Sequence, residues 1–235
     1  MAPVDTPGLE LAHPEALPPA LHSLIASLAS RPWADETYLA GSAALALYTG
    51  HRQVHSLDLM SSTNRLTSPE RRDLLGDLLA MDAGTRVETA RDGFLYVRIG
   101  GAGVRFFYYP YPLIDPEREL DGLAVASAMD LGLMKLGAII SRGTRRDFVD
   151  LYLLCRQLPL AEQLRRSPEK YGHVRDFPLQ ALKGLADLSL VAGEPMPPLD
   201  EPLAWDEVES WLRHEVITLG RTKVGLPAAA PEAET

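Results

Sequence analysis

A Gly-Ser pair between two short β-prone segments governs the local structure of residues 38 to 60, which read YLAGSAALALYTGHRQVHSLDLM. Gly41 ends the first segment, and Ser42 stands where the N-cap of a helix over AALALY belongs. In VHSLDLM alternate side chains point to opposite faces of a strand, so Ser56 and Asp58 share one face and the leucines the other. This segment predicts a strand, a tight turn, a helix and a second strand with one polar face.

Composition limits the classes of protein that the chain can belong to. With 235 residues, 46% of them hydrophobic, it can bury a full core as one large domain or two small ones. The formal charge of −9 argues against a surface that coats nucleic acid broadly, because phosphate contacts need clustered cations. Any RNA contact is therefore expected in one cationic cleft.

The single cysteine, Cys155, permits no internal disulfide and no cysteine-rich zinc site, which fits a reducing compartment. The N-terminal residues MAPVDTPGLELAHPEALPPA lack the cationic start and apolar stretch of a signal peptide. No run reaches the roughly 18 apolar residues that a membrane span needs. We therefore expect a cytoplasmic protein that does not contact the membrane.

Further along the chain, SPERRDLLGDLLAM predicts an amphipathic helix with Ser68 as its cap. Residues Phe94–Ile99 and Val104–Tyr109 predict the two arms of a β-hairpin around a glycine turn. Ser127 and Asp130 form the sequence pattern of a capping box at the start of a helix, and another helix follows Gly143. Prolines then separate further helices.

These patterns predict an α/β (α+β) chain with four parts. Residues 1–18 and 225–235 are rich in proline and alanine and are expected to be loose ends. Residues 19–120 are expected to form the α/β region, and residues 121–224 a helical C-terminal region.

Charged residues in the two helices after the hairpin have structural as well as functional interpretations. Lys135 has apolar neighbours, so its ammonium must either extend to water or meet an anion. Arg142 lies two helical turns later, close to the same helix face. Asp147 and Asp150 are neighbours at the start of the next helix, where Asp147 also fits a capping box with Thr144.

The order of these groups resembles the AbiEii-type nucleotidyltransferase-like toxins. The matching text is YLAGSAALALYTGHRQVHSLDLM at residues 38–60 and ASAMDLGLMKLGAIISRGTRRDFVDLYLL at residues 126–154. The resemblance implies a nucleotidyltransferase fold, a small mixed sheet flanked by helices and followed by a helical region. It also implies transfer of a nucleotidyl group from an NTP, assisted by Mg²⁺ or Mn²⁺, to an RNA acceptor, most plausibly tRNA, with a cognate antitoxin as partner.

The resemblance also implies roles for individual residues. In such enzymes the Gly-Ser turn cradles the triphosphate, strand carboxylates hold the metal, and the helical lysine contacts phosphates. The catalytic residues it implies are Asp58, Lys135, Asp147 and Asp150, with Asp58 also binding the metal. The nucleotide-binding residues it implies are Gly41, Ser42, Arg52, Ser56, Lys135 and Arg142.

Two positions depart from the family pattern. Ser56 stands where the first metal-binding aspartate is usual, and the later strand VRFFYY has no third carboxylate. Some branches of the family also have a hydroxyl residue two places before the aspartate, and there Ser56 would be a phosphorylation switch. Three interpretations therefore stay open: an active transferase, a protein that binds nucleotide or RNA and has lost turnover, and a purely structural ion network.

Overall fold

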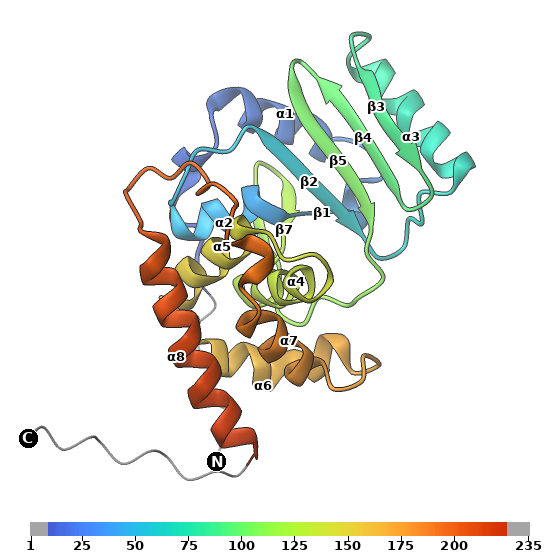
Figure 1. The fold of residues 1–235 in the computed structure, drawn as a ribbon. Helices are drawn as coiled ribbons and strands as arrows, with labels where there is room; N and C mark the ends of the chain where they lie inside the picture. The colour runs from blue at the N-terminus through green and yellow to red at the C-terminus, as the bar shows by residue number, and fades with distance from the viewer. Residues whose placement is uncertain (1–8, 225–235) are drawn as a thin grey trace, which may run out of the picture. The chain divides into compact units, whose positions relative to one another are not determined.

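The computed structural model describes residues 9–224, apart from the side chains of residues 190 and 222–224. The chain forms two compact units, the first of Met1–Met134 with Leu199–Glu201 and the second of Lys135–Pro198 with Pro202–Thr235. All the strands that the structure describes belong to the first unit (Figure 1). The predicted tail, 225–235, lies outside the described residues.

The first unit contains a seven-stranded sheet in the order β3-β4-β5-β2-β1-β7-β6. The β2–β5 and β1–β7 pairs are parallel, and the other neighbouring pairs are antiparallel. This mixed sheet with flanking helices confirms the predicted fold class. The strands are β1 (Tyr38–Ala40), β2 (Ser56–Ser61), β3 (Arg86–Arg91), β4 (Phe94–Ile99), β5 (Ala102–Tyr108), β6 (Arg118–Leu120) and β7 (Leu123–Val125).

The helices of the first unit precede or interrupt the strands, whereas those of the second unit follow one another. The boundary between the units falls within one helix, α4. The helices are α1 (Pro19–Ala29), α2 (Gly41–Thr49), α3 (Ser68–Met81), α4 (Ala128–Ser141), α5 (Arg145–Cys155), α6 (Leu160–Tyr171), α7 (Phe177–Ala186) and α8 (Trp205–Val224). No helix among the described residues is long and apolar enough to cross a membrane.

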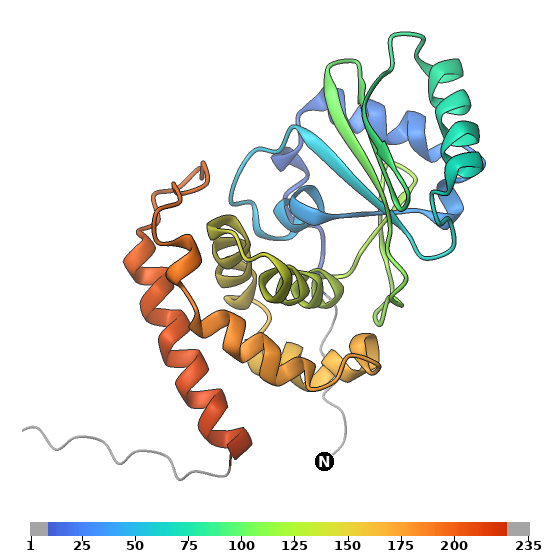
Figure 2. The ribbon, with the colours of Figure 1, turned by 45° about the vertical axis from the view of Figure 1, so that its right-hand side comes forward.

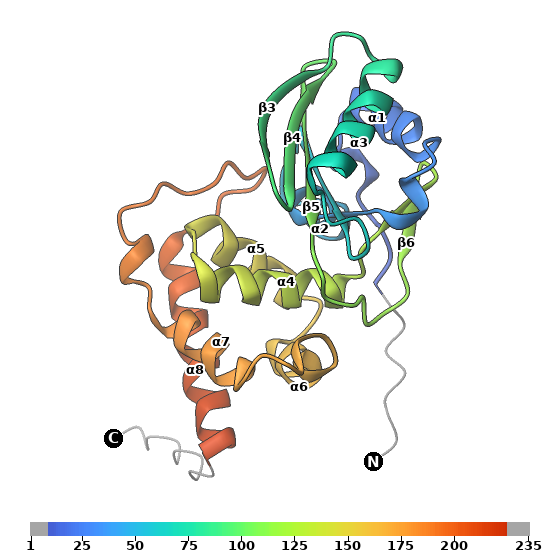
Figure 3. The same cartoon turned by 90° about the vertical axis from the view of Figure 1, so that its right-hand side faces the viewer.

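One face of the sheet packs into the core of the first unit. In β2 the predicted alternation is confirmed, since Leu57 and Leu59 are fully buried while Ser56 and Asp58 are partly exposed. On β5 the buried Phe106 meets Trp33 edge-to-face, with ring centroids 5.5 Å apart. Figure 3 shows α1 and α3 on the same side of the β3–β4–β5 strands. Ser56 and Asp58 of β2 lie on the opposite face of the sheet.

The hydrogen bonds at the helix starts test the predicted capping residues. Ser127 forms the N-cap half of the predicted box, because the Asp130 amide donates to Ser127 Oγ, and the Ser127 hydroxyl in turn donates to Asp130 Oδ2. The assignment of Ser42 as an N-cap is wrong: α2 begins one residue earlier, at Gly41, so Ser42 lies inside its first turn.

Ser68 as the cap of α3 is also wrong. Thr67 is the N-cap, and it forms a reciprocal capping box with Glu70. Threonine and serine are both good N-caps, so the glutamate three residues later decides between them. That glutamate follows Thr67 at the correct spacing, and Ser68 has no such partner.

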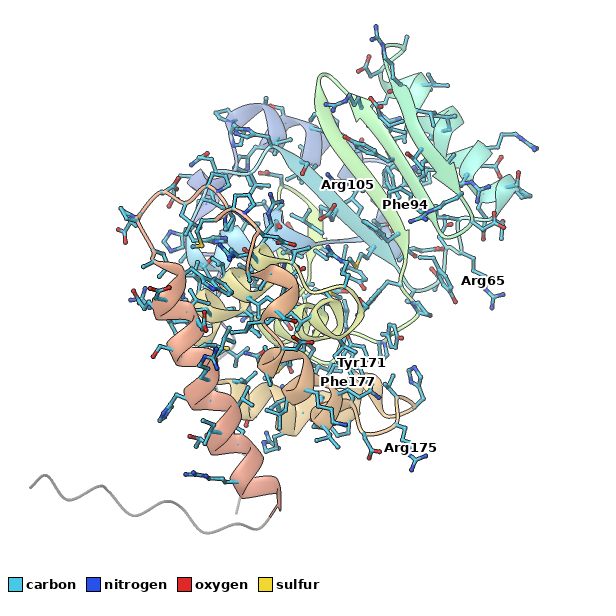
Figure 4. All side chains as sticks on the ribbon, in the orientation of Figure 1. Arg65, Phe94, Arg105, Tyr171, Arg175 and Phe177 are labelled. Carbon is cyan, nitrogen blue, oxygen red and sulfur yellow. The ribbon has the colours of Figure 1, made fainter. Side chains whose placement is uncertain are left out.

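Aromatic contacts stabilise the second unit. Phe148 of α5 meets Trp205 of α8 edge-to-face, with ring centroids 6.3 Å apart. Tyr152 of α5 meets Trp211 of α8 in the same way, with centroids 5.3 Å apart. The helices α7 and α8 pack together, as Figure 2 shows in orange and red. Tyr171 and Phe177, labelled in Figure 4, stack with centroids 4.2 Å apart.

The sequence patterns missed three strands, β3, β6 and β7. All six residues of β3 are exposed, so it lacks the buried alternation by which strands are recognised. β3 is an edge strand, and its pairing with β4 shifts register between Val87 and Thr89.

Ala16 and Leu17, in the stretch predicted to be loose, are buried.

The alternation in β2 predicts that truncating two adjacent side chains, Leu59 and Met60, lowers the free energy of unfolding by different amounts. Leu59→Ala should lower the free energy of unfolding by about 2–5 kcal/mol, because it leaves a cavity in the core. Met60→Ala, on the partly exposed face, should cost clearly less. Urea unfolding measures both, and equal losses would contradict the assignment of the faces.

Candidate active site

Asp58 lies against the first residue of α2. The antiparallel register of β1 and β2 sets Ala40 opposite Asp58, so the residue after Ala40, Gly41, meets the aspartate side chain. A Cβ atom at Gly41 would lie 2.3 Å from Asp58 Oδ2, and Gly41 has a φ of +63°. Only glycine satisfies both the backbone angle and the close approach. The predicted Gly-Ser corner is therefore in place, with a carboxylate next to it.

Ser42 and Arg52 are joined at the same corner. Arg52 is 4% exposed, and its Nη2 donates to Ser42 Oγ over 2.9 Å. The charged group of Arg52 is thus used to position the first turn of α2. Ser42, at the second residue of the helix, lies where backbone amides have no partner within the helix and where the helix dipole favours anions.

Arg105 is the site residue that the sequence patterns missed. The parallel register of β2 and β5 sets Arg105 directly opposite Asp58, and its Nη1 donates to Asp58 Oδ1 over 2.9 Å. The same nitrogen lies 3.4 Å from Ser56 Oγ. Figure 4 labels Arg105 on β5. The alternation in VRFFYY could have placed Arg105 on a polar face, but the parallel pairing with β2 is a long-range choice that local patterns do not specify.

The side chains at this corner do not fit a resident metal ion. Among the described residues, no group of three or more His, Cys, Asp or Glu side chains is placed to hold one. Mg²⁺ needs several oxygen ligands, usually including one or two carboxylates with substrate phosphates. Here the one carboxylate, Asp58, is paired with Arg105, and the Ser56 hydroxyl is a weak neutral ligand. Binding of Mg²⁺ or Mn²⁺ by Asp58 stays a prediction.

The second unit holds the other predicted cluster. Lys135 Nζ lies 2.7 Å from Asp150 Oδ2 and 3.1 Å from Asp147 Oδ1. Lys135 is 9% exposed, Asp147 2% and Asp150 0%. Asp147 also accepts from the backbone amide and hydroxyl of Thr144, so the predicted capping box is confirmed. The lysine is therefore placed between two buried carboxylates.

Burial and charge act in opposite directions on this cluster. Burial alone would lower the pKa of Lys135, but the carboxylates of Asp150 and Asp147 outweigh it and raise the pKa above its ordinary value. Burial alone would raise the pKa of Asp147, but Lys135, the Thr144 hydroxyl and Arg142 hold it below its ordinary value. Lys135 and Asp147 are therefore both charged at neutral pH.

The two arginines near this cluster lie mostly in solvent. The Arg142 side chain is 64% exposed, with its Nη1 3.6 Å from Asp147 Oδ2. Arg146 is also exposed. The structure thus brings Lys135, Asp147 and Asp150 together in the second unit. In the first unit it brings Gly41, Ser42, Arg52, Ser56 and Asp58 together with Arg105.

Comparison with known proteins identifies one clear relative in sequence. No model of a known protein family matches the chain. Uncharacterized protein aq_aa25 of Aquifex aeolicus is 30% identical over 192 residues, which cover 77% of this chain and 87% of that protein.

Two solved structures are similar at lower identity. A Helicobacter pylori protein assigned as a nucleotidyltransferase has 17% identity and a TM-score of 0.50, over 89% of this chain and 95% of that chain. The nucleotidyltransferase toxin MenT4 of Mycobacterium tuberculosis H37Rv has 15% identity and a TM-score of 0.48, over 89% and 85% of the two chains. The first of these matches confirms the predicted nucleotidyltransferase-like fold.

The contact between Gly41 and Asp58 predicts opposite effects of the same substitution at two glycines. Gly41→Ala should lower the free energy of unfolding by about 1–3 kcal/mol, because it adds backbone strain and a clash with Asp58. Gly76→Ala is the matched control: it lies inside α3 with open space around it, and it should raise stability by about 0.5–1 kcal/mol. Thermal unfolding measures both, and a neutral Gly41→Ala would disprove the close contact.

Replacement of Lys135, which lies in the buried cluster together with Asp147 and Asp150, should change how the stability of the protein depends on pH. Lys135→Met should lower the free energy of unfolding at pH 7 by about 3–5 kcal/mol, because it leaves two buried carboxylates without their cation. Burial then raises the carboxyl pKa values, so this variant should gain stability as the pH falls from about 7 to 5.

In the native chain Lys135 and Asp147 should contribute no such gain in stability between pH 7 and 5. The contribution of Asp147, whose pKa is lowered, is present above its ordinary pKa of 3.8 and is lost as the pH falls through the lower folded value. The contribution of Lys135, whose pKa is raised, is lost only as the pH rises above its ordinary 10.5. Urea unfolding at pH 5 and pH 7 measures the free energy of unfolding of both proteins. If Lys135→Met is less stable than the native protein by the same amount at both pH values, the effect comes from packing rather than from charge.

Proposed function

We propose that this chain, which belongs to the same family as uncharacterized protein aq_aa25 of Aquifex aeolicus, transfers a nucleotidyl group from an NTP to an RNA acceptor. The nucleotidyltransferase fold supports the class of reaction. The observation that carries the proposal is the contact of the Asp58 carboxylate with Gly41 at the start of α2. It puts an ionisable group beside a helix end that favours phosphate.

In the proposed complex the NTP lies with its triphosphate at the first turn of α2. The free backbone amides of that turn donate to phosphate oxygens, with Ser42 held in place by Arg52. Gly41 has no side chain, so the phosphates can approach the backbone closely. The reacting phosphorus then lies beside Asp58.

The reaction is an in-line displacement at the α-phosphorus. An acceptor hydroxyl forms the new P–O bond, the bond to pyrophosphate breaks, and the hydroxyl loses its proton. Asp58 is the carboxylate in this unit that is placed to accept that proton, once Arg105 shifts from it. Arg105, always charged, then neutralises charge that develops on the phosphate oxygens.

The second cluster contains one buried cation and one exposed cation. The resemblance assigns phosphate contacts to Lys135 and Arg142, and ordering roles to Asp147 and Asp150. The Lys135 ammonium is already satisfied by two carboxylates, which favours a structural role for it. Arg142, with most of its side chain in solvent, is the freer of the two cations to meet a phosphate.

Finer features of the proposal rest on the resemblance alone. They are membership of the AbiEii-type toxins, tRNA as the acceptor, a cognate antitoxin and a divalent metal that accompanies the nucleotide. A cytoplasmic location is proposed from the single cysteine and the absence of a signal-peptide pattern in the N-terminal residues. Ser56 lies within reach of Arg105, so a phosphate on its hydroxyl would compete with Asp58 for the guanidinium.

A second candidate function is nucleotide or RNA binding without turnover. The observation that favours it is the Arg105–Asp58 ion pair, since the carboxylate oxygen that accepts from the guanidinium is not open to a metal ion or an acceptor hydroxyl while the pair is intact. The two functions differ in whether nucleotide becomes covalently attached to RNA.

Incubation of the purified protein with labelled NTPs, Mg²⁺ or Mn²⁺ and total RNA tests the proposal. We expect label in RNA from the native protein and a loss of at least about 100-fold in Asp58→Asn, the scale of a lost general base. Asp73→Asn, an exposed carboxylate on α3, is the matched control and should keep full activity. NTP binding without incorporation, under every metal tried, would establish the second candidate instead.

A further inference from the structure

The sheet face that carries Asp58 continues across β5, β4 and β3 as a surface rich in arginine and aromatic residues. Pairing sets Arg105 opposite Asp58 and Tyr96 opposite Arg105, so these three form one row across the sheet. The next row along the strands brings together Phe107, Phe94 and Arg91. We call this surface the arginine–aromatic face; it comprises Arg86, Arg91, Phe94, Tyr96, Arg105 and Phe107.

The side chains of this face contact one another but are not buried. The Cζ atom of Arg105 lies 5.2 Å from the ring centroid of Tyr96, and that of Arg91 lies 5.1 Å from the ring centroid of Phe94. The rings of Phe94 and Phe107 are tilted, with centroids 5.0 Å apart. The three rings are partly exposed. Figure 4 labels Arg105 and Phe94 on neighbouring strands.

The charge of this region is opposite to that of the chain. Residues 86–108 contain four arginines against one glutamate and one aspartate, a net charge of +2 in a chain of net charge −9. Glu88 pairs with Arg98, and Asp92 with Arg71 of α3. Among the described residues, neither Arg86 nor Arg91 has a carboxylate partner. Two exposed guanidiniums on this face are therefore available to an anion.

We propose that the arginine–aromatic face binds a single-stranded stretch of nucleic acid. Aromatic rings and guanidinium planes stack on unpaired bases, and free arginines bind the backbone phosphates. Phe94 and Tyr96 are two residues apart on one strand, about 7 Å, and can each meet a different base. A paired duplex hides its base faces, so it cannot use these rings.

The inference deepens the proposed function, on which it rests for the identity of the acceptor. Asp58 contacts Gly41 on one side and Arg105 on the other. The nucleotide would lie on the α2 side, and the acceptor strand would reach Asp58 across β5 and β4. Gly103, beside Arg105 in β5, permits this arrangement of the face, because a Cβ there would lie 3.2 Å from Tyr96.

Binding of a fluorescein-labelled 12-nucleotide single-stranded RNA, measured by anisotropy without NTP, tests the inference. Phe94→Ala and Tyr96→Ala should each weaken binding about 5- to 150-fold, the range measured for loss of one stacking contact. Arg86→Ala with Arg91→Ala should weaken binding and reduce the slope of log affinity against log salt by about 1.4, for two lost phosphate contacts. Arg72→Ala, exposed on α3, is the matched control and should bind like the native protein.

The outcomes separate this inference from the proposed function. Equal binding of the native and Arg86→Ala/Arg91→Ala proteins, or equal affinity for a duplex of the same length, would overturn the inference. Asp58→Asn removes the carboxylate that pairs with Arg105 of the face, so it should bind the RNA at least as tightly as the native protein while it loses transfer. Binding that depends on the face in a protein that incorporates no nucleotide would therefore support the inference and contradict the transferase.

Discussion

The approach of Asp58 to Gly41 is the constraint on which the candidate active site depends. It requires a left-handed backbone at Gly41, no side chain there, and a β1–β2 register that sets Ala40 opposite Asp58. A shift of one residue in that register would turn Asp58 into the core and a leucine toward α2. The buried leucines of β2 prevent such a shift, so the hydrophobic core fixes the position of the carboxylate.

The sequence predicted local features well, because their causes are local. The alternation in β2, the Gly-Ser corner, the hairpin, the Ser127 cap of α4 and the capping box of α5 each depend on residues close together in the chain. The errors have equally specific causes. Ser68 competed with the adjacent Thr67 for one capping role, and the exposed β3 has no buried alternation. Arg105 and Asp58 are 47 residues apart in the chain and meet only through the parallel pairing of β2 with β5.

The two predicted charged clusters differ in what their burial permits. Lys135, Asp147 and Asp150 are almost inaccessible, and the ammonium pairs with both carboxylates, so removal of the lysine leaves buried carboxylates without that cation. Asp58 and Arg105 are partly exposed, and an ion pair of that kind is worth little energy. The exposed pair can therefore open to admit a ligand at low cost, whereas the buried cluster is suited to holding α4 and α5 together.

The bulge and the charges of β3 have a consequence for how copies of this protein behave at high concentration. An edge strand has unpaired backbone N–H and C=O groups, with which a strand of another chain can form hydrogen bonds. Here a neighbouring molecule that aligned a strand with β3 would meet an interrupted hydrogen-bond ladder and two guanidiniums of like sign. The β3 edge of the sheet is therefore protected against pairing with a strand of another molecule, although it is open to solvent.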